Sequence, residues 1–170
     1  YAALNGTDLI VEAVFEDLGL KQSVFRQLDA IAKPGAILAT NTSGLDIDAI
    51  AAATTRAHDV IGAHFFSPAH VMRLLEVVRT DTTAPDVVAT LMALGARIGK
   101  VAVLARVYPG FIGNALFRQY NREAHFLVED GALPHEVDAA LVAFGYAMGI
   151  FAVHDMAGND VGYPTRKAQI

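Results

Sequence analysis

One histidine and one glutamate in this chain have the type and the spacing of an acid/base pair. His64 ends the apolar run 60–64, and Glu76 lies inside the next apolar run, 74–78. Histidine has an unperturbed pKa of about 6.5, so its side chain can accept or release a proton near neutral pH. A carboxylate on the second ring nitrogen would fix the tautomer and stabilise the protonated ring. The alternative is that His64 packs in the core while Glu76 faces solvent from an edge strand.

The elements that must position this pair follow from the hydrophobic pattern. Short apolar runs bounded by turn residues predict strands, at 8–14, 36–40, 60–64, 74–78 and 101–104. Apolar residues at helical spacing predict helices between them, at 16–32, 45–53 and 85–98. Strands that alternate with helices indicate an α/β domain whose sheet is mostly parallel and carries helices on both faces.

The pattern changes after Pro109 and Gly110. Helices are predicted at 111–129 and 134–144, and strand signals stop. We therefore expect residues 1–106 to form the α/β domain and residues 107–170 to form part of an all-α domain. The longest uncharged apolar stretch, 139–153, is too short to span a bilayer and is interpreted as a buried helix and turn.

Three polar clusters follow the first three predicted strands. They are Glu16 with Asp17, the run Asn41 to Ser43, and His64 with Ser67. In open α/β sheets, ligands bind outside the carboxyl ends of the strands, so these clusters are expected to meet at one site. Ser and Asn are also common in turns and helix caps, so Ser43 can cap the helix at 45–53 as well as take part in chemistry.

Composition excludes several classes of function. The chain has 170 residues, 54% of them hydrophobic, and a net charge of −5 with its 13 lysines and arginines scattered. No nucleic-acid partner is expected, because such proteins concentrate basic charge on one surface. Without cysteine there is no thiolate metal site, and the remaining histidines lack metal-ligand spacing, so no metal is expected. No signal peptide opens the chain, which predicts that it is not secreted.

The segments described so far closely resemble the L-3-hydroxyacyl-CoA dehydrogenase family, particularly the dehydrogenase part of multifunctional fatty-acid β-oxidation enzymes. The matching motifs span nearly the whole chain in family order, at 8–16, 41–45, 64–72, 75–78 and 109–114. The resemblance implies oxidation of a 3-hydroxyacyl-CoA substrate by NAD. His64 would be the general base and Glu76 would orient it, while Ser43 and Asn114 would hydrogen-bond the reacting oxygen and position the substrate.

The same resemblance implies a set of cofactor-binding residues. Glu16 and Lys21 match positions that contact the nicotinamide half of NAD, and Asn41, Ser43 and Ser67 lie where the family lines that pocket. Judged from the residues alone, Lys21 is an ordinary exposed charge on a helix.

A further charged residue, Glu12, lies inside the apolar first strand. It needs a partner there, which the sequence does not identify.

The resemblance also implies how the chain fits into a larger protein. Residues 1–106 would be a Rossmann-like NAD-binding domain without its amino-terminal βαβ unit, and residues 107–170 part of the helical carboxyl-terminal domain. We expect a homodimer or a part of a larger multifunctional protein. The expected compartment is the cytoplasm in a bacterium, and the mitochondrion or peroxisome in a eukaryote.

Two alternatives remain open at this point. The first is a non-catalytic fragment that keeps the fold for binding or structure, which is favoured by Ala115 where the family usually has arginine. The second is another two-domain NAD-dependent hydroxyacid enzyme, in which a lysine moves the proton. The family's usual Met-Gly-Pro-Phe is also changed here, because Ile150 replaces the proline.

Overall fold

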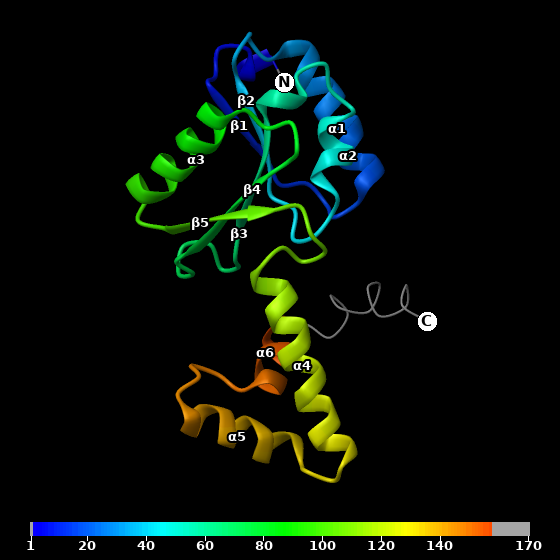
Figure 1. Cartoon of the computed structure of the whole chain (residues 1–170), viewed down its shortest axis with the longest axis vertical. Helices are drawn as coiled ribbons and strands as arrows, with labels where there is room; N and C mark the ends of the chain where they lie inside the picture. The colour runs from blue at the N-terminus through cyan, green and yellow to red at the C-terminus, as the bar shows by residue number, and fades with distance from the viewer. Residues whose placement is uncertain (1, 158–170) are drawn as a thin grey trace. The chain divides into compact units, whose positions relative to one another are not determined.

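The computed structural model describes residues 2–157, which divide into two compact units at Ala115 and Leu116. The first unit is built on a five-stranded sheet in the order β1-β2-β3-β4-β5 (Figure 1). Its strands are β1 (Leu9–Glu12), β2 (Ile37–Thr40), β3 (Val60–Phe65), β4 (Leu74–Arg79) and β5 (Val101–Arg106). Neighbouring strands are parallel except β3 and β4, which are antiparallel. The predicted mostly parallel α/β sheet is therefore confirmed.

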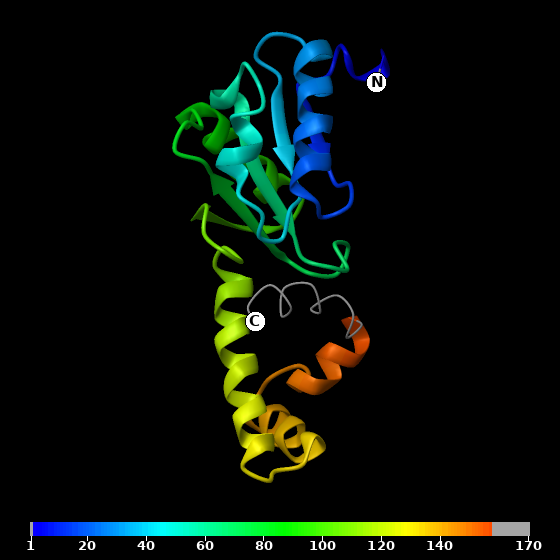
Figure 2. The ribbon, with the colours of Figure 1, turned by 90° about the vertical axis from the view of Figure 1, so that its right-hand side faces the viewer.

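Helices cover both faces of this sheet, as the sequence predicts. Helices α1 (Leu18–Ile31) and α2 (Ile47–Ala51) lie on one face, and α3 (Pro85–Arg97) lies on the other (Figures 1 and 2). Each face has its own apolar core, one packed under α1 and α2 and the other under α3. Short 3-10 turns occupy Ala2–Leu4 and Ala57–Asp59.

Aspartates fix where the first two helices begin. Asp17 accepts a hydrogen bond from the Leu20 backbone N–H at 2.7 Å, and Asp46 accepts one from Ala49 at 3.2 Å. Such caps satisfy backbone donors that the first turn of a helix leaves without partners. Asp46 rather than Ser43 therefore caps α2, which leaves the Ser43 side chain available for other contacts.

The β3–β4 connection brings the acid/base pair together. The connection between the two strands contains no helix, and short connections join antiparallel neighbours whereas parallel ones need a crossover. In the resulting register, His64 lies directly opposite Glu76. Residues opposite each other on antiparallel strands have Cβ atoms about 5 Å apart, so their side chains can touch.

The second unit contains helices only among its described residues. They are α4 (Gly113–Glu129), which begins within the first unit, α5 (Pro134–Phe144) and α6 (Ile150–Ala157) (Figure 1). Ala124, Val137 and Ile150 form its small core. The expectation of a buried helix and turn at 139–153 is wrong on burial, because Phe144 is 84% exposed. Helix α5 buries only one stripe, so most of its apolar residues face outward.

The start of α6 explains how the chain tolerates Ile150 where the family has proline. Both carboxylate oxygens of Asp138 accept backbone N–H groups of α6, from Phe151 at 3.0 Å and Ala152 at 2.9 Å. Gly149 allows this approach, because a Cβ there would lie 2.2 Å from the Asp138 side chain. A carboxylate at a helix N-terminus thus fixes this turn without a proline.

No helix among residues 2–157 is long and apolar enough to cross a membrane.

Candidate active site

A pocket of about 420 Å³ lies at the carboxyl ends of the first three strands. All three polar clusters that the sequence singled out contribute to it. Its lining residues are Ala13, Val14, Glu16, Asn41, Ser43, His64, Phe65, Phe66, Ser67 and Asn114. The polar groups therefore converge where open α/β sheets bind ligands.

His64 and Glu76 form a close, buried pair behind this pocket. The Nδ1 atom of His64 lies 2.7 Å from Oε2 of Glu76, and the two residues are 6% and 0% exposed. The ring of His64 packs against Phe66 at 4.4 Å and Phe111 at 5.8 Å between centroids. These contacts hold the imidazole in one orientation, and His64 also lines the pocket.

The second oxygen of Glu76 is held by the backbone at the start of α4. Oε1 accepts the N–H groups of Ile112 at 3.0 Å and Gly113 at 2.7 Å. The amino-terminal end of a helix carries partial positive charge, which favours a carboxylate there. Because Glu76 then acts as acceptor on both oxygens, Nδ1 of His64 carries the proton and Nε2 keeps its lone pair. Sequence reasoning missed this support, although the turn at Pro109 and Gly110 just before a predicted helix was a signal for it.

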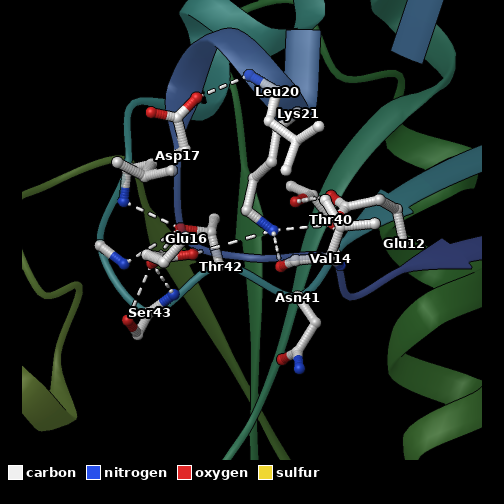
Figure 3. A network of polar contacts seen from close by, with 12 residues as sticks. Glu12, Val14, Glu16, Asp17, Leu20, Lys21, Thr40, Asn41, Thr42 and Ser43 are labelled. Carbon is white, nitrogen blue, oxygen red and sulfur yellow. Dashed lines mark hydrogen bonds and ion pairs between the residues drawn. The ribbon is translucent and has the colours of Figure 1, made fainter. Parts of the chain in front are cut away.

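Glu16 and Ser43 form a second polar pair on the pocket wall. One carboxylate oxygen of Glu16 accepts the Ser43 hydroxyl and backbone N–H, both at 2.8 Å, and the Thr42 hydroxyl at 2.7 Å (Figure 3). The Ser43 hydroxyl thus uses its one hydrogen as the donor to Glu16. Toward the pocket, the Ser43 oxygen is therefore a hydrogen-bond acceptor.

Two asparagines join neighbouring segments of the site. Asn114 donates from its side-chain amide to the Ser43 carbonyl at 3.1 Å, and Asn41 accepts the Phe65 backbone N–H at 2.9 Å. Both asparagines line the pocket. Ser67 also lines the pocket, in the loop after β3.

Lys21 is placed differently from the other predicted site residues. It does not line the pocket but is fully enclosed behind the wall, with its Nζ atom 2.8 Å from Glu12 (Figure 3). The buried face of α1 is made by Lys21, Phe25 and Leu28. The lysine is thus the partner that Glu12 required, and its interpretation as an exposed charge is wrong.

Comparison with known proteins identifies the family. Residues 1–107 match the family model described as 3-hydroxyacyl-CoA dehydrogenase, NAD binding domain, and residues 110–169 match 3-hydroxyacyl-CoA dehydrogenase, C-terminal domain. The chain belongs to the 3-hydroxyacyl-CoA dehydrogenase family. Among the described residues, no group of histidines and carboxylates could hold a metal ion.

Relatives within this family are similar along almost the whole chain. The peroxisomal bifunctional enzyme of Homo sapiens is 51% identical over 166 residues, which are 98% of this chain and 23% of that protein. A peroxisomal fatty acid beta-oxidation multifunctional protein of Oryza sativa is 41% identical, over 95% of this chain and 22% of that protein. The crystal structure of 3-hydroxybutyryl-CoA dehydrogenase from Escherichia coli is 42% identical with a TM-score of 0.90, covering 96% of this chain and 35% of that one. The chain thus spans about a quarter of the length of these curated relatives.

Proposed function

We propose that the protein oxidises an L-3-hydroxyacyl-CoA to the 3-ketoacyl-CoA with NAD, as a step of fatty-acid β-oxidation. The observation that carries this proposal is the 2.7 Å contact between His64 Nδ1 and Glu76 at the edge of a pocket rich in polar groups. It supplies what removal of a hydroxyl proton requires, which is a base held in a defined tautomer.

His64 is the general base in this reaction. With the Nδ1 proton donated to Glu76, the Nε2 lone pair accepts the proton of the substrate hydroxyl. The ring then becomes positively charged, and the adjacent Glu76 carboxylate stabilises that charge effectively because both residues are buried. NAD supplies the hydride acceptor when bound. In the reverse direction the same histidine returns the proton to the ketone oxygen.

Ser43 and Asn114 position the reacting oxygen. The Ser43 hydroxyl donates to Glu16 in the empty pocket, and its rotation would let it donate instead to a lone pair of the substrate hydroxyl or ketone oxygen, while the substrate proton goes to His64. Asn114 is tied to the Ser43 backbone at 3.1 Å, so the two groups keep a fixed separation. Holding groups in place in this way lowers the entropy cost of reaching the transition state.

The residues present fit the nicotinamide end of the cofactor. Ala13 and Val14 give an apolar wall for a flat ring, while Glu16, Asn41 and Ser67 offer polar groups for its carboxamide. No lysine or arginine is among the residues that line this pocket in the described part of the chain. In Rossmann-like folds the pyrophosphate binds at the amino-terminal end of a helix, so we assign this pocket to the nicotinamide end of NAD only.

Both earlier alternatives have less support. An enzyme that moves the proton with a lysine would place one in the pocket, yet Lys21 is enclosed behind the wall. A structural fragment would not need a buried histidine whose partner, Glu76, is held by two further backbone hydrogen bonds. Ala115 remains a departure from the family, but neither asparagine contact depends on it.

We further propose that the chain is the dehydrogenase part of a longer multifunctional protein. Residues 1–106 would belong to the cofactor-binding domain and residues 107–170 to the helical domain, a division supported by the two family matches. Of the expected compartments, we favour the peroxisome, because both curated relatives described above are named as peroxisomal proteins. Dimerisation through the helical part is a further expectation.

A direct assay tests this proposal. The complete protein should oxidise NADH when a 3-ketoacyl-CoA is added, with an absorbance decrease proportional to enzyme concentration. A complete, folded protein that binds NADH but shows no such turnover would contradict the proposed function.

A further inference from the structure

A buried lysine lies directly behind the pocket wall. Lys21 is 0% exposed, although lysine is almost never fully buried unless it is paired. Its ammonium donates to Glu12 at 2.8 Å and to the Val14 carbonyl at 3.2 Å, and lies 3.8 Å from Oε2 of Glu16 (Figure 3). These contacts of the ammonium are all with the end of β1 and the residues that follow it.

Glu12 keeps this lysine in place. Its first oxygen receives Lys21 and the Val14 backbone N–H at 2.5 Å, and its second receives the Thr40 hydroxyl at 2.8 Å. A buried ion pair is favourable only when the remaining hydrogen-bonding positions are also satisfied, as they are here. The pair thus links β1, β2 and α1 at one point.

The pair is connected to the pocket in two ways. Both backbone groups of Val14, which lines the pocket, are held by it, one by Glu12 and the other by Lys21. In addition, Lys21 faces one oxygen of Glu16, whose other oxygen binds the Ser43 hydroxyl and backbone N–H. A single line of contacts therefore runs from the buried pair to Ser43.

We propose that Lys21 is a positioning residue that acts through Glu16 on Ser43. Its ammonium is enclosed behind the wall at 13–16 in the ligand-free chain. Glu12 and Thr40 fix the ammonium, the ammonium restrains the Glu16 carboxylate, and Glu16 sets the direction of the Ser43 hydroxyl. The role of Ser43 in turnover rests on the proposed function, whereas the restraint of Ser43 does not.

The test compares two pairs of substitutions in the complete protein. Glu12→Gln with Lys21→Met removes both charges together and avoids leaving either one buried alone. Asp29→Asn with Arg56→Gln is the matched control, because it also removes an ion pair of α1, with a 2.7 Å contact, but one that does not touch the pocket. Thr40→Val is a milder second variant, which removes one hydrogen bond to Glu12 and keeps the shape of the side chain.

Amide hydrogen exchange of the ligand-free protein gives the first readout. The Ser43 N–H has Glu16 as its acceptor, so its exchange should be at least fivefold faster in Glu12→Gln/Lys21→Met, and faster in the same sense in Thr40→Val. The control pair should leave it within twofold of the wild type. Unchanged exchange at Ser43 in both test variants would overturn the proposal, even if the protein has no dehydrogenase activity.

Kinetic coupling gives the second readout. If Lys21 acts through Glu16 on Ser43, the effects of the two changes should not add. The factor by which Ser43→Ala lowers kcat should then be at least threefold smaller in the Glu12→Gln/Lys21→Met background than in the wild type. In the control background the effect of Ser43→Ala should be unchanged. Equal effects of Ser43→Ala in all three backgrounds would show that the buried pair is structural only and would overturn the proposal. Absence of turnover in the wild type would instead contradict the proposed function, and the exchange result would then decide this inference.

Discussion

At the scale of single residues, Glu76 divides its two oxygens between different tasks. One binds Nδ1 of His64, and the other accepts two backbone N–H groups from Ile112 and Gly113. The carboxylate is therefore fixed from both sides before it supports the histidine. Preorganisation of this kind is how enzymes place charge where it develops during reaction.

Glu76→Gln tests this arrangement. Glutamine keeps the size of the side chain but places an amide N–H2 against either the histidine or the two backbone donors, so the His64 tautomer is no longer set. We expect kcat to fall by about 10²- to 10⁴-fold while the dissociation constant of NADH stays within about threefold. Steady-state kinetics and NADH fluorescence titration measure the two quantities. A proportionate loss of NADH binding would mean that Glu76 supports the pocket rather than the base.

The sequence predicts some of these residues better than others. His64 and Glu76 can be recognised because each lies in an apolar run, where a buried polar side chain costs free energy unless it has a hydrogen-bonding partner. Lys21 could not be placed, since a lysine on a helix is usually solvated, whereas here Lys21 is 0% exposed and the neighbouring Leu20 is 42% exposed. The signal that was available is Glu12, whose unpartnered charge in a strand requires a nearby cation.

At the scale of elements, the antiparallel β3–β4 pair makes the site possible. Alternating strands and helices predicted the sheet correctly, but the helix-free connection between 65 and 74 is what reverses β4 and aligns Glu76 with His64. The α4 backbone contacts to Glu76 could not be predicted, because they depend on tertiary packing across 37 residues of sequence.

Close packing between β3 and its neighbours gives a stability prediction. A Cβ on Gly62 would lie 2.5 Å from Ile47 and 2.8 Å from Val78, both fully buried. We expect Gly62→Ala to lower the free energy of unfolding by about 1–3 kcal/mol, because an overpacked core must shift. Gly19→Ala, on the exposed side of α1 with no contact closer than 3.4 Å, should remain within about 1 kcal/mol of the wild type. Urea unfolding of both variants measures this, and equal effects of the two would contradict it.

A second element-level prediction concerns pH. Burial alone would raise the pKa of Asp29, but hydrogen bonds from the Thr55 backbone N–H, the Arg56 guanidinium and the Thr55 hydroxyl, together with the Arg56 charge, hold it below its ordinary value. A lowered native pKa stabilises the fold above the unfolded value of about 3.9, and that stabilisation is lost as the pH falls through the native pKa.

Asp29→Asn should therefore lower the free energy of unfolding by about 1–3 kcal/mol at pH 7. The difference from the wild type should shrink as the pH is lowered below about 4. Urea unfolding across this range measures it. A difference that is the same at pH 7 and pH 3 would show that the carboxylate charge is not its cause.

At the scale of the whole molecule, the pocket suits only the nicotinamide end of NAD. Its lining offers an apolar wall and uncharged polar groups beside Glu16 and His64, which suit a nicotinamide ring and a hydroxyl but not a pyrophosphate. The chain spans 23% of the human peroxisomal bifunctional enzyme that it resembles. The proposed activity is accordingly a property of the complete protein, and every kinetic test belongs there.

The central claim is that His64 is the base that moves the substrate proton, and His64→Gln in the complete protein tests it most directly. Glutamine can keep a hydrogen bond to Glu76 but cannot take up a proton. We predict that turnover of 3-ketoacyl-CoA and NADH falls by at least about 10²-fold, while NADH still binds with a dissociation constant within about threefold of the wild type. Near-normal turnover in this variant would contradict the account.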